Sequence, residues 1–170
     1  MIRLSKNYRS HESIIDAIGA MFDDPIVAAE TFNDTLDLTS ITSHPSNRVI
    51  FQNVLTDDEE LDVIYEYLEK CEKLFQYVDI GIITPYKSQA VIIQQHVDER
   101  LGIVVNVVDE FHGIERHAII ISCTLDYDKV IGQNKDTEWL NMAISRAKSL
   151  VIIVGRASYL EKLPEGRRCV

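Results

Sequence analysis

Apolar residues along this chain follow two kinds of spacing, one typical of amphipathic helices and one typical of short buried strands. Apolar side chains three or four positions apart predict helices from about residue 11, from residue 57, over residues 87–101 and over residues 136–148. Short runs rich in Ile and Val predict strands at residues 48–55, 79–84, 103–108, 118–124 and 150–154. This alternation predicts an α/β fold with three layers, in which helices cover both faces of a mainly parallel sheet.

The predicted helices carry start and stop signals. Pro25 closes the first helix, and Gly102 ends the third. Thr56 with Glu59 forms a capping box at the start of the second. The inward-facing positions that the spacing predicts are, in chain order, Ile14, Ile15, Ile18, Met21, Phe22, Leu61, Ile64, Tyr65, Leu68, Cys71, Leu74 or Phe75, Val91, Ile92, Gln95, Val97, Leu140, Ala143, Ile144 and Ala147.

The order of elements favours a single domain over residues 1–170. Residues 31–47, rich in Thr, Ser, Asn and Asp, predict a long surface loop, and residues 160–170 form a tail. In parallel sheets that are covered on both faces, reactive side chains gather at the carboxyl ends of the strands. We therefore expect functional residues in the loops after Thr84, Val108 and Thr124.

The composition is that of one ordinary globular domain. Of the 170 residues, 46% are hydrophobic and 26% are charged, which suffices for a buried core. No apolar run approaches the ~18 residues that span a membrane, and the polar residues 1–7 give no secretory signal. The three cysteines lie far apart, without metal-binding spacing. We expect a reduced intracellular protein without membrane contact, in the cytoplasm or alternatively the nucleus.

The net charge of −10 is the opposite of what a free-standing nucleic-acid binder shows. The acid is concentrated in one stretch, whose members are Asp57, Asp58, Glu59, Glu60, Asp62, Glu66, Glu69, Glu72 and Asp79. We interpret this stretch as a solvated helix face. The net charge therefore indicates solubility and one acidic face, and leaves the sign of the functional surface open.

Two short stretches begin helices and carry candidate chemistry. In Asn7–His11 (NYRSH), Arg9 stands ahead of a helix and can reach an anion in an interdomain cleft, or can be a surface arginine beside a capping serine. In residues 81–89 (GIITPYKSQ) a buried strand ends at Thr84, and Pro85 suits a turn or a first helical position. Tyr86, Lys87 and Gln89 then sit at the rim. An aromatic ring beside a cation suits a single strand of nucleic acid, although the tyrosine can equally pack at a helix start.

Two further stretches carry candidates for contact with a nucleotide. In residues 108–117 (VDEFHGIERH), Gly113 lets the backbone approach a phosphate, and Glu115 can accept a hydrogen bond from a ribose hydroxyl or a metal-bound water. His112 and His117 lack further ligands at suitable spacing, so we expect no metal site. In residues 139–148 (WLNMAISRAK), a small apolar helix can hold Arg146 rigidly toward a γ-phosphate; a structural salt bridge is the alternative.

Taken in order, YRSH, ITPYKSQ, VDEFHGIER and NMAISRAK resemble the motifs of the second RecA-like domain of superfamily-one helicases. The resemblance is strongest to the Up-frameshift-like 5′-to-3′ group and, within it, to the Armitage and SDE-type helicases of RNA silencing. It extends from Leu4 to about Leu160. It implies a RecA-like fold of the AAA and P-loop NTPase type and the C-terminal motor half of an ATP-dependent RNA helicase.

The resemblance also implies roles for individual residues. Arg146, as the arginine finger, and Arg9 would act on the γ-phosphate of ATP with Mg²⁺, a site shared with a first RecA-like domain in cis or in trans. The residues implied near the nucleotide are Tyr8, Gly113, Glu115 and Arg116. Those implied along a single strand of RNA, with DNA as the alternative, are Thr84, Pro85, Tyr86, Val108 and Asp109. RNA-silencing proteins are further expected partners.

Three departures from the family pattern are visible. His112 stands where the family usually has Gln, and a histidine can still donate a hydrogen bond. Ser145 replaces a threonine and keeps the hydroxyl. The stretch between NVL and the acidic helix is short, without the Gly- and Ser-rich loop of relatives.

The sequence contains no phosphate-binding loop of the form GxxxxGK[ST]. We therefore expect no ATP turnover by the chain alone, because lysine and magnesium normally hold the phosphates that the finger approaches. Two alternatives remain at this point. The chain, starting at Met1, can be a natural short product that acts as a non-enzymatic interaction module through its acidic helix, or it can be a superfamily-one DNA helicase domain.

Overall fold

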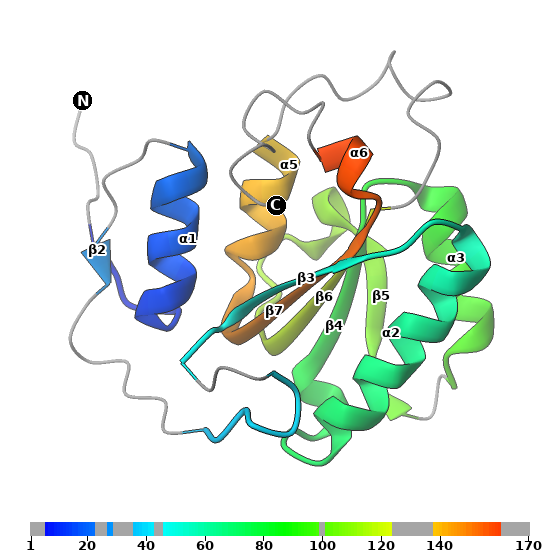
Figure 1. Ribbon diagram of the computed structural model, residues 1–170, viewed down its shortest axis with the longest axis horizontal. Coiled ribbons are helices and arrows are strands. Elements are labelled where there is room, and N and C mark those ends of the chain that lie inside the picture. Colours follow the sequence, from blue (N-terminus) through cyan, green and yellow to red (C-terminus); the bar gives the residue numbers. More distant parts are fainter. Residues whose placement is uncertain are drawn as a thin grey trace.

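A parallel five-stranded sheet forms the centre of the computed structural model (Figure 1). The structure describes residues 6–22, 27–28, 36–42, 46–98, 101–123 and 138–160. The strand order is β3 (Val49–Asn53), β7 (Ala147–Gly155), β6 (Arg116–Cys123), β4 (Ile80–Thr84) and β5 (Val104–Val107), and all neighbours are parallel. The three inner strands are almost wholly buried, which explains why they form continuous apolar runs in the sequence.

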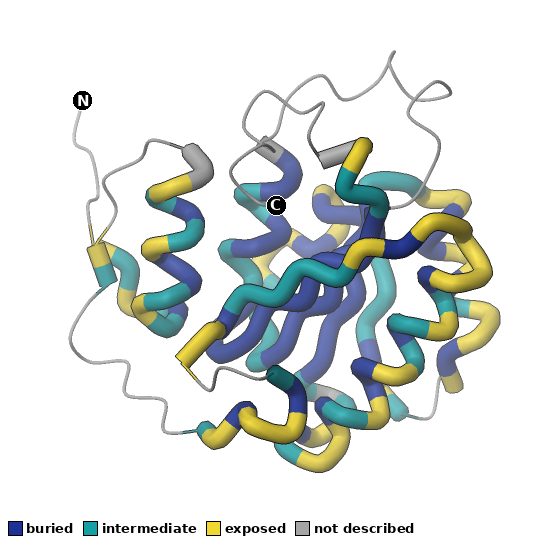
Figure 2. The backbone as a smooth tube through the Cα atoms, viewed as in Figure 1, coloured by how far each residue is buried: buried dark blue, intermediate teal, exposed yellow. Residues whose placement is uncertain are grey.

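Helices cover both faces of this sheet, so the predicted three-layer α/β fold is confirmed. Figure 1 shows α1 (Glu12–Phe22) and α5 (Glu138–Ile144) on one face, and α2 (Asp57–Glu72) and α3 (Lys87–His96) on the other. One core cluster joins α1 and α5 to the sheet and a second joins α2 and α3, and Figure 2 shows the buried strands between them. The short α6 (Ala157–Leu160) follows β7.

Smaller elements complete the described chain. The strands β1 (Lys6–Asn7) and β2 (Val27–Ala28) pair in parallel as a separate small sheet. Two 3-10 turns, Tyr77–Asp79 and Val108–Phe111, precede β4 and follow β5. Of the predicted features, Pro25, Thr124, Cys169, the side chains of Met21 and Phe22, and residues 31–35, 43–45, 99–100 and 161–170 lie outside the described residues.

Thr56 is the N-cap of α2 as predicted, but the carboxylate of Glu59 bonds the residue ahead of the N-cap and not the N-cap itself. The hydroxyl of Thr56 accepts a hydrogen bond from the amide of Glu59 at 3.1 Å, and the carboxylate of Glu59 accepts one from the amide of Leu55 at 2.7 Å. The loop ahead of β3 lies only partly on the surface, because Leu38 is fully buried and Ile41 is 8% exposed in the core beneath α2.

The predicted inner face of α3 is wrong. Val91 and Ile92 are 55% and 45% exposed, and Gln95 is exposed as well, while Gln89 is buried. Of the four predicted positions only Val97 is buried, and the helix itself ends at His96. Apolar spacing failed here because the amide of Gln89 pairs with buried polar groups of other elements, which turns its side of the helix toward the sheet.

The helix before the last strand is shorter than predicted. It ends at Ile144, and β7 begins at Ala147, because Ala147 pairs with Arg116 in the neighbouring strand β6. The predicted inward positions are nevertheless buried, since Ala147 continues as the first residue of the strand. Arg146 therefore lies on the turn between helix and strand and not on the helix.

Glu60 corrects the interpretation of the acidic stretch as a uniformly solvated face. Its side chain is 2% exposed, whereas its neighbours Glu59 and Asp62 are exposed. The burial is local to one position, because Glu60 lies on the side of α2 that faces β6, beside the buried hydroxyl of Ser122.

Candidate functional site

The segment Asn7–His11 is held against the start of β7 by a set of hydrogen bonds. The side-chain oxygen of Asn7 accepts from the amides of Arg9 at 2.8 Å and Ser10 at 3.1 Å. The fully buried hydroxyl of Ser10 donates to the carbonyl of Ala147 at 2.6 Å, and the amide of His11 donates to the carbonyl of Lys148 at 2.8 Å. The backbone that carries Arg9 is thereby fixed relative to the turn that carries Arg146.

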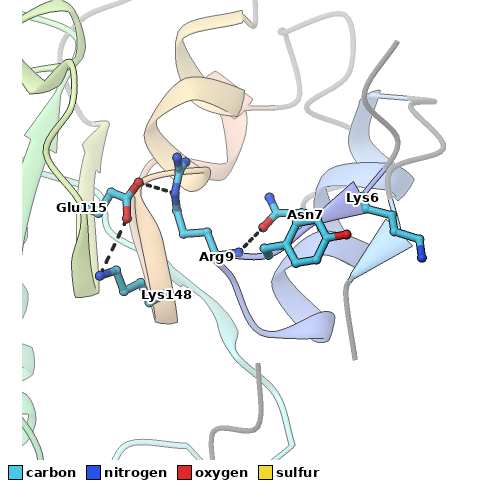
Figure 3. Close-up of a pocket in the computed structure, with 6 residues that line it drawn as sticks. Lys6, Asn7, Arg9, Glu115 and Lys148 are labelled. Carbon is cyan, nitrogen blue, oxygen red and sulfur yellow. Dashed lines mark hydrogen bonds and ion pairs between the residues drawn. The ribbon is translucent and has the colours of Figure 1, made fainter. Parts of the chain in front are cut away.

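Arg9, Glu115 and Lys148 form one charged cluster (Figure 3). The guanidinium of Arg9 lies 2.5 Å from one carboxylate oxygen of Glu115, and the ammonium of Lys148 lies 3.7 Å from the other. Arg9 also donates through Nη1 to the carbonyl of Ser145 at 3.0 Å. All three charged side chains are about one-third exposed, so their charges face an open space with only partial solvent screening.

This cluster lines a hollow of about 530 Å³. Its lining residues are Lys6, Asn7, Tyr8, Arg9, Glu115 and Lys148. Figure 3 shows Lys6 at the side of the hollow away from Glu115. Three cations and a single carboxylate thus line the hollow, in a chain whose net charge is −10. The local balance is positive, which is the requirement for an anion such as a phosphate.

Arg146 belongs to the turn that contacts this cluster, although it is not among the residues that line the hollow. Its chain neighbours Ser145 and Ala147 accept hydrogen bonds from Arg9 and Ser10, respectively. Its own amide donates to Ala143, and its carbonyl accepts from the amide of Arg116 at 3.1 Å. Within the described part of the chain, the buried Nε of Arg146 has no hydrogen-bond partner. A buried guanidinium nitrogen without a partner can still receive an acceptor.

The loop between β5 and β6 is fixed in the core at Phe111. The ring of Phe111 is fully buried against Gly81, where an added Cβ would lie 2.7 Å from it. Gly113 has a φ of +76°, and an added Cβ would meet nothing within 4 Å. The glycine is therefore required by its left-handed conformation and not by a close contact in this structure. Arg116 donates to the carbonyl of Glu115 at 2.9 Å.

The two histidines of this stretch have separate partners. His112 is exposed, and its Nδ1 lies 2.6 Å from the carbonyl of Asp109. His117 lies 3.0 Å from the hydroxyl of Ser149 and stacks on Phe75 with ring centroids 6.1 Å apart. Across the residues that the structure describes, no three His, Cys, Asp or Glu side chains gather closely enough to hold a metal ion.

The two groups of predicted site residues lie at opposite ends of the parallel strands, one at the amino ends and the other at the carboxyl ends. Arg9, Glu115 and Arg146 gather at the amino ends of β6 and β7. Thr84 ends β4 and Val108 follows β5, at the carboxyl ends. Glu115 lies in the expected loop after Val108, yet the charged cluster that it forms is at the amino ends of the strands. The reason is that residues 108–115 run back from the end of β5 to the start of β6.

The residues predicted to follow a nucleic-acid strand differ in their exposure. Thr84 is fully buried with its hydroxyl turned to Gln89, and Val108 is 5% exposed. Pro85 and Tyr86 are half-buried, and Asp109 is exposed. The expectation of Gln89 at the rim is wrong, because its side chain is 5% exposed. Of the five residues predicted to follow the nucleic-acid strand, only Asp109 is exposed.

Lys87, which follows Tyr86 in the sequence, provides a positive charge at the carboxyl ends of the strands. It is 79% exposed and pairs with Glu110 at 2.7 Å. The hydrogen bond and the charge of Glu110 raise the pKa of Lys87, and the same hydrogen bond lowers the pKa of Glu110. Both residues border a hollow of about 350 Å³ between α3 and β5, which Val91 and Val105 also line.

Comparison with known proteins places this chain in a family. Residues 1–158 match a family model described as an AAA domain. The chain belongs to this family. It is 30% identical over 210 residues to helicase MOV-10 of Gallus gallus, covering 98% of the chain and 22% of that protein. It is 32% identical over 193 residues to helicase mov-10-B.1 of Danio rerio, covering 90% of the chain and 19% of that protein.

These relatives identify the AAA-family chain as a helicase domain of superfamily one. This agrees with the resemblance of its motifs to superfamily-one helicases. The chain spans about a fifth of the length of these curated relatives. A solved structure, the C-terminal domain of a possible DNA helicase from Lactobacillus plantarum WCFS1, shares the fold with a TM-score of 0.62 at 16% identity. That similarity covers 96% of this chain and 94% of the other. Within the described residues, no helix is both long and apolar enough to cross a membrane.

Proposed function

We propose that this chain is the second RecA-like motor domain of an ATP-dependent helicase that moves 5′-to-3′ along RNA. In this proposal it supplies the arginine finger and part of the nucleic-acid track, and a first RecA-like domain in cis or in trans supplies the phosphate-binding loop. The observation that supports it best is the charged cluster, because Arg9, Glu115 and the Arg146 turn come from three separate parts of the chain. Such convergence is typical of a site and not of a single surface salt bridge.

The residues present fit the terminal phosphate of ATP. Arg9 and Lys148 offer positive charge in the hollow, and the buried Nε of Arg146 has no partner within the described residues. ATP with Mg²⁺ would supply the phosphoanhydride bond whose hydrolysis drives the cycle. Arg146 and Arg9 would stabilise the negative charge that develops on the γ-phosphate, and Glu115 would accept from the ribose. Tyr8, Gly113 and Arg116 would border the nucleotide.

The nucleic-acid strand would lie at the carboxyl ends of the β-strands, along Pro85, Tyr86 and Asp109. Thr84 and Val108 would support that surface from below, since both are buried. Separation of the two sites by the sheet would let nucleotide-driven closure of the two domains act on the strand at a distance. The resemblance of the four motifs to helicases of RNA silencing supports RNA as the substrate and RNA-silencing proteins as partners.

The finger is tested by joining this chain to a matching first domain and measuring ATP hydrolysis in the presence of single-stranded RNA. We expect Arg146→Ala to lower kcat by roughly 10³-fold, the low end of what arginine fingers contribute. Arg156→Ala is the matched control, because Arg156 follows the other end of β7 and contacts Asp57. Unchanged kcat in Arg146→Ala contradicts the finger role. The isolated chain is expected to show no turnover.

A further inference from the structure

Four polar side chains form a buried hydrogen-bond network beneath the turn between β4 and α3. They are contributed by four elements: Glu60 of α2, Thr84 of β4, Gln89 of α3 and Ser122 of β6. None is more than 5% exposed. The network lies outside the charged cluster and joins the helices of one face to two central strands.

The hydrogen bonds of this network run in a consistent direction. The hydroxyl of Thr84 donates to the side-chain oxygen of Gln89 at 2.6 Å. The amide group of Gln89 donates to Glu60 at 2.7 Å and to Ser122 at 2.6 Å. The hydroxyl of Ser122 donates to the other oxygen of Glu60 at 2.9 Å. The two carboxylate oxygens of Glu60 are thus the final acceptors of the network. Glu60 thereby fixes the orientation of the other three side chains.

A buried carboxylate is a costly way to attach a helix to a sheet. Apolar side chains of similar volume would join the same elements without a desolvation penalty. Buried polar groups of this kind fix one arrangement of their neighbours, because every alternative leaves a donor or an acceptor unpaired. The arrangement fixed here is that of Thr84 and Gln89, the residues at the two ends of the turn.

The start of α3 needs such a constraint. Its N-cap residue, Tyr86, makes no side-chain capping hydrogen bond. The first helical hydrogen bond of α3 runs from the amide of Ala90 to the carbonyl of Tyr86 at 3.0 Å. Gln89, one residue earlier, is held from the interior by Glu60 and Ser122. The network therefore anchors the first turn of α3 through the side chain of Gln89, whereas a side-chain cap would act on the backbone N–H groups.

We propose that Glu60 is a positioning residue that holds the Thr84–Gln89 turn in place and, with it, the exposed residues of the nucleic-acid track. The effect on the nucleic-acid track rests on the proposed function, whereas the effect on the turn does not. Glu60 acts through Gln89 and Thr84 and does not itself touch the strand, because it is 2% exposed.

The test compares Glu60→Gln with Glu69→Gln in the whole chain. Both remove one negative charge from α2, but Glu69 is exposed and outside the network. In Glu60→Gln an NH2 group replaces one of the two carboxylate oxygens, so either Ser122 or Gln89 meets a donor where it had an acceptor. We expect the amide of Ala90 to exchange with solvent at least about tenfold faster in Glu60→Gln, at a temperature where all chains are folded, and unchanged exchange in Glu69→Gln.

The second measurement is the affinity for a fluorescein-labelled 12-nucleotide oligouridine at fixed salt. Loss of one negative charge alone should leave affinity for a polyanion equal or slightly higher, as in Glu69→Gln. We expect Glu60→Gln to bind about fivefold more weakly, against that electrostatic trend. If Glu60→Gln does not fold, Thr84→Val replaces it, because it removes the hydroxyl at the other end of the network with little change of shape.

The outcomes separate the two proposals. Faster Ala90 exchange together with weaker binding supports both. Faster exchange with unchanged binding, or with no binding by the unmodified chain, supports positioning of the turn and overturns the assignment of the track. Exchange and binding equal to those of Glu69→Gln overturn the positioning role and leave the network as a core attachment only.

Discussion

Glu115 pairs with Arg9 at 2.5 Å across the hollow at the amino ends of β6 and β7, and its second carboxylate oxygen lies 3.7 Å from Lys148. The same carboxylate therefore partly neutralises both cations. In the proposed site, a phosphate that entered the hollow would compete with Glu115 for these partners. In the proposed motor, Glu115 would turn to the nucleotide's ribose when the phosphate arrives.

Glu115→Gln should separate binding from turnover. In the isolated chain we expect tripolyphosphate to bind several-fold more tightly, because the competing carboxylate is gone while Arg9 and Lys148 remain. Joined to a first domain, the same variant should hydrolyse ATP more slowly, since the ribose contact is weakened. Titration calorimetry and a steady-state assay measure the two effects. Glu69→Gln controls for net charge, and equal tripolyphosphate affinity in the two variants would count against the competition.

Ser10→Ala should destabilise the fold through a single lost hydrogen bond. The hydroxyl of Ser10 is fully buried and donates to the carbonyl of Ala147 at 2.6 Å, so its removal takes this donor from a buried carbonyl. We expect the free energy of unfolding to fall by about 1–3 kcal/mol, measured by urea denaturation. Ser13→Ala is the control, because the hydroxyl of Ser13 contacts Ser46 at an exposed position. Equal losses in both variants would show that Ser10 does not anchor the segment.

The apolar pattern was enough to predict the sheet, its covering helices and most of the core. Strands buried on both faces, such as β4, leave a continuous apolar run that can be identified without knowing their neighbours. Glu60 and Gln89 could not be predicted in this way, because their burial depends on partners in other elements. A polar residue shows no inward preference in the sequence until those partners are known.

The candidate site was predicted by motif and not by geometry. Residue type and position made Arg9, Glu115 and Arg146 candidates, the resemblance implied their roles, and the structure brings Arg9 and Glu115 into contact. Their position at the amino ends of β6 and β7 was not predictable from the rule that functional residues gather at the carboxyl ends of parallel strands. The turn at Arg146 was missed because it depends on pairing of Ala147 with Arg116, far away in the sequence.

Gly113→Ala should cost stability for conformational reasons alone. The φ of +76° is unfavourable for a residue with a Cβ by roughly 1–2 kcal/mol, while the added atom meets nothing within 4 Å. Gly113→Asn should cost less, because asparagine tolerates this region better. Gly81→Ala provides the contrast, since its Cβ would lie 2.7 Å from the buried ring of Phe111. Urea denaturation should rank Gly113→Asn as the mildest change and Gly81→Ala as the most severe, and a reversed order would contradict the conformational argument.

The buried thiol of Cys71 should make the free energy of unfolding depend on pH in alkaline solution. Burial raises the pKa of its thiol from 9.0 to about 12, and the nearby charge of Lys70 offsets this only in part. A pKa raised in the folded state means that the protonated thiol is favoured by folding. The associated stability is fully present below pH 9 and is lost as the pH rises from about 9 toward 12. Burial also raises the pKa values of Tyr65 and Tyr67, which act in the same direction.

We therefore expect the free energy of unfolding to fall steadily as the pH is raised above 9. Cys71→Ala should be less stable than the unmodified chain near neutral pH, because it removes buried volume. Its loss of stability between pH 9 and pH 11 should be smaller, since the thiol that titrates is absent while Tyr65 and Tyr67 remain. Urea denaturation of both chains at several pH values measures the difference. Parallel curves would show that ionisation of Cys71 does not contribute, whereas convergence of the two curves at high pH supports the burial of a neutral thiol as its physical cause.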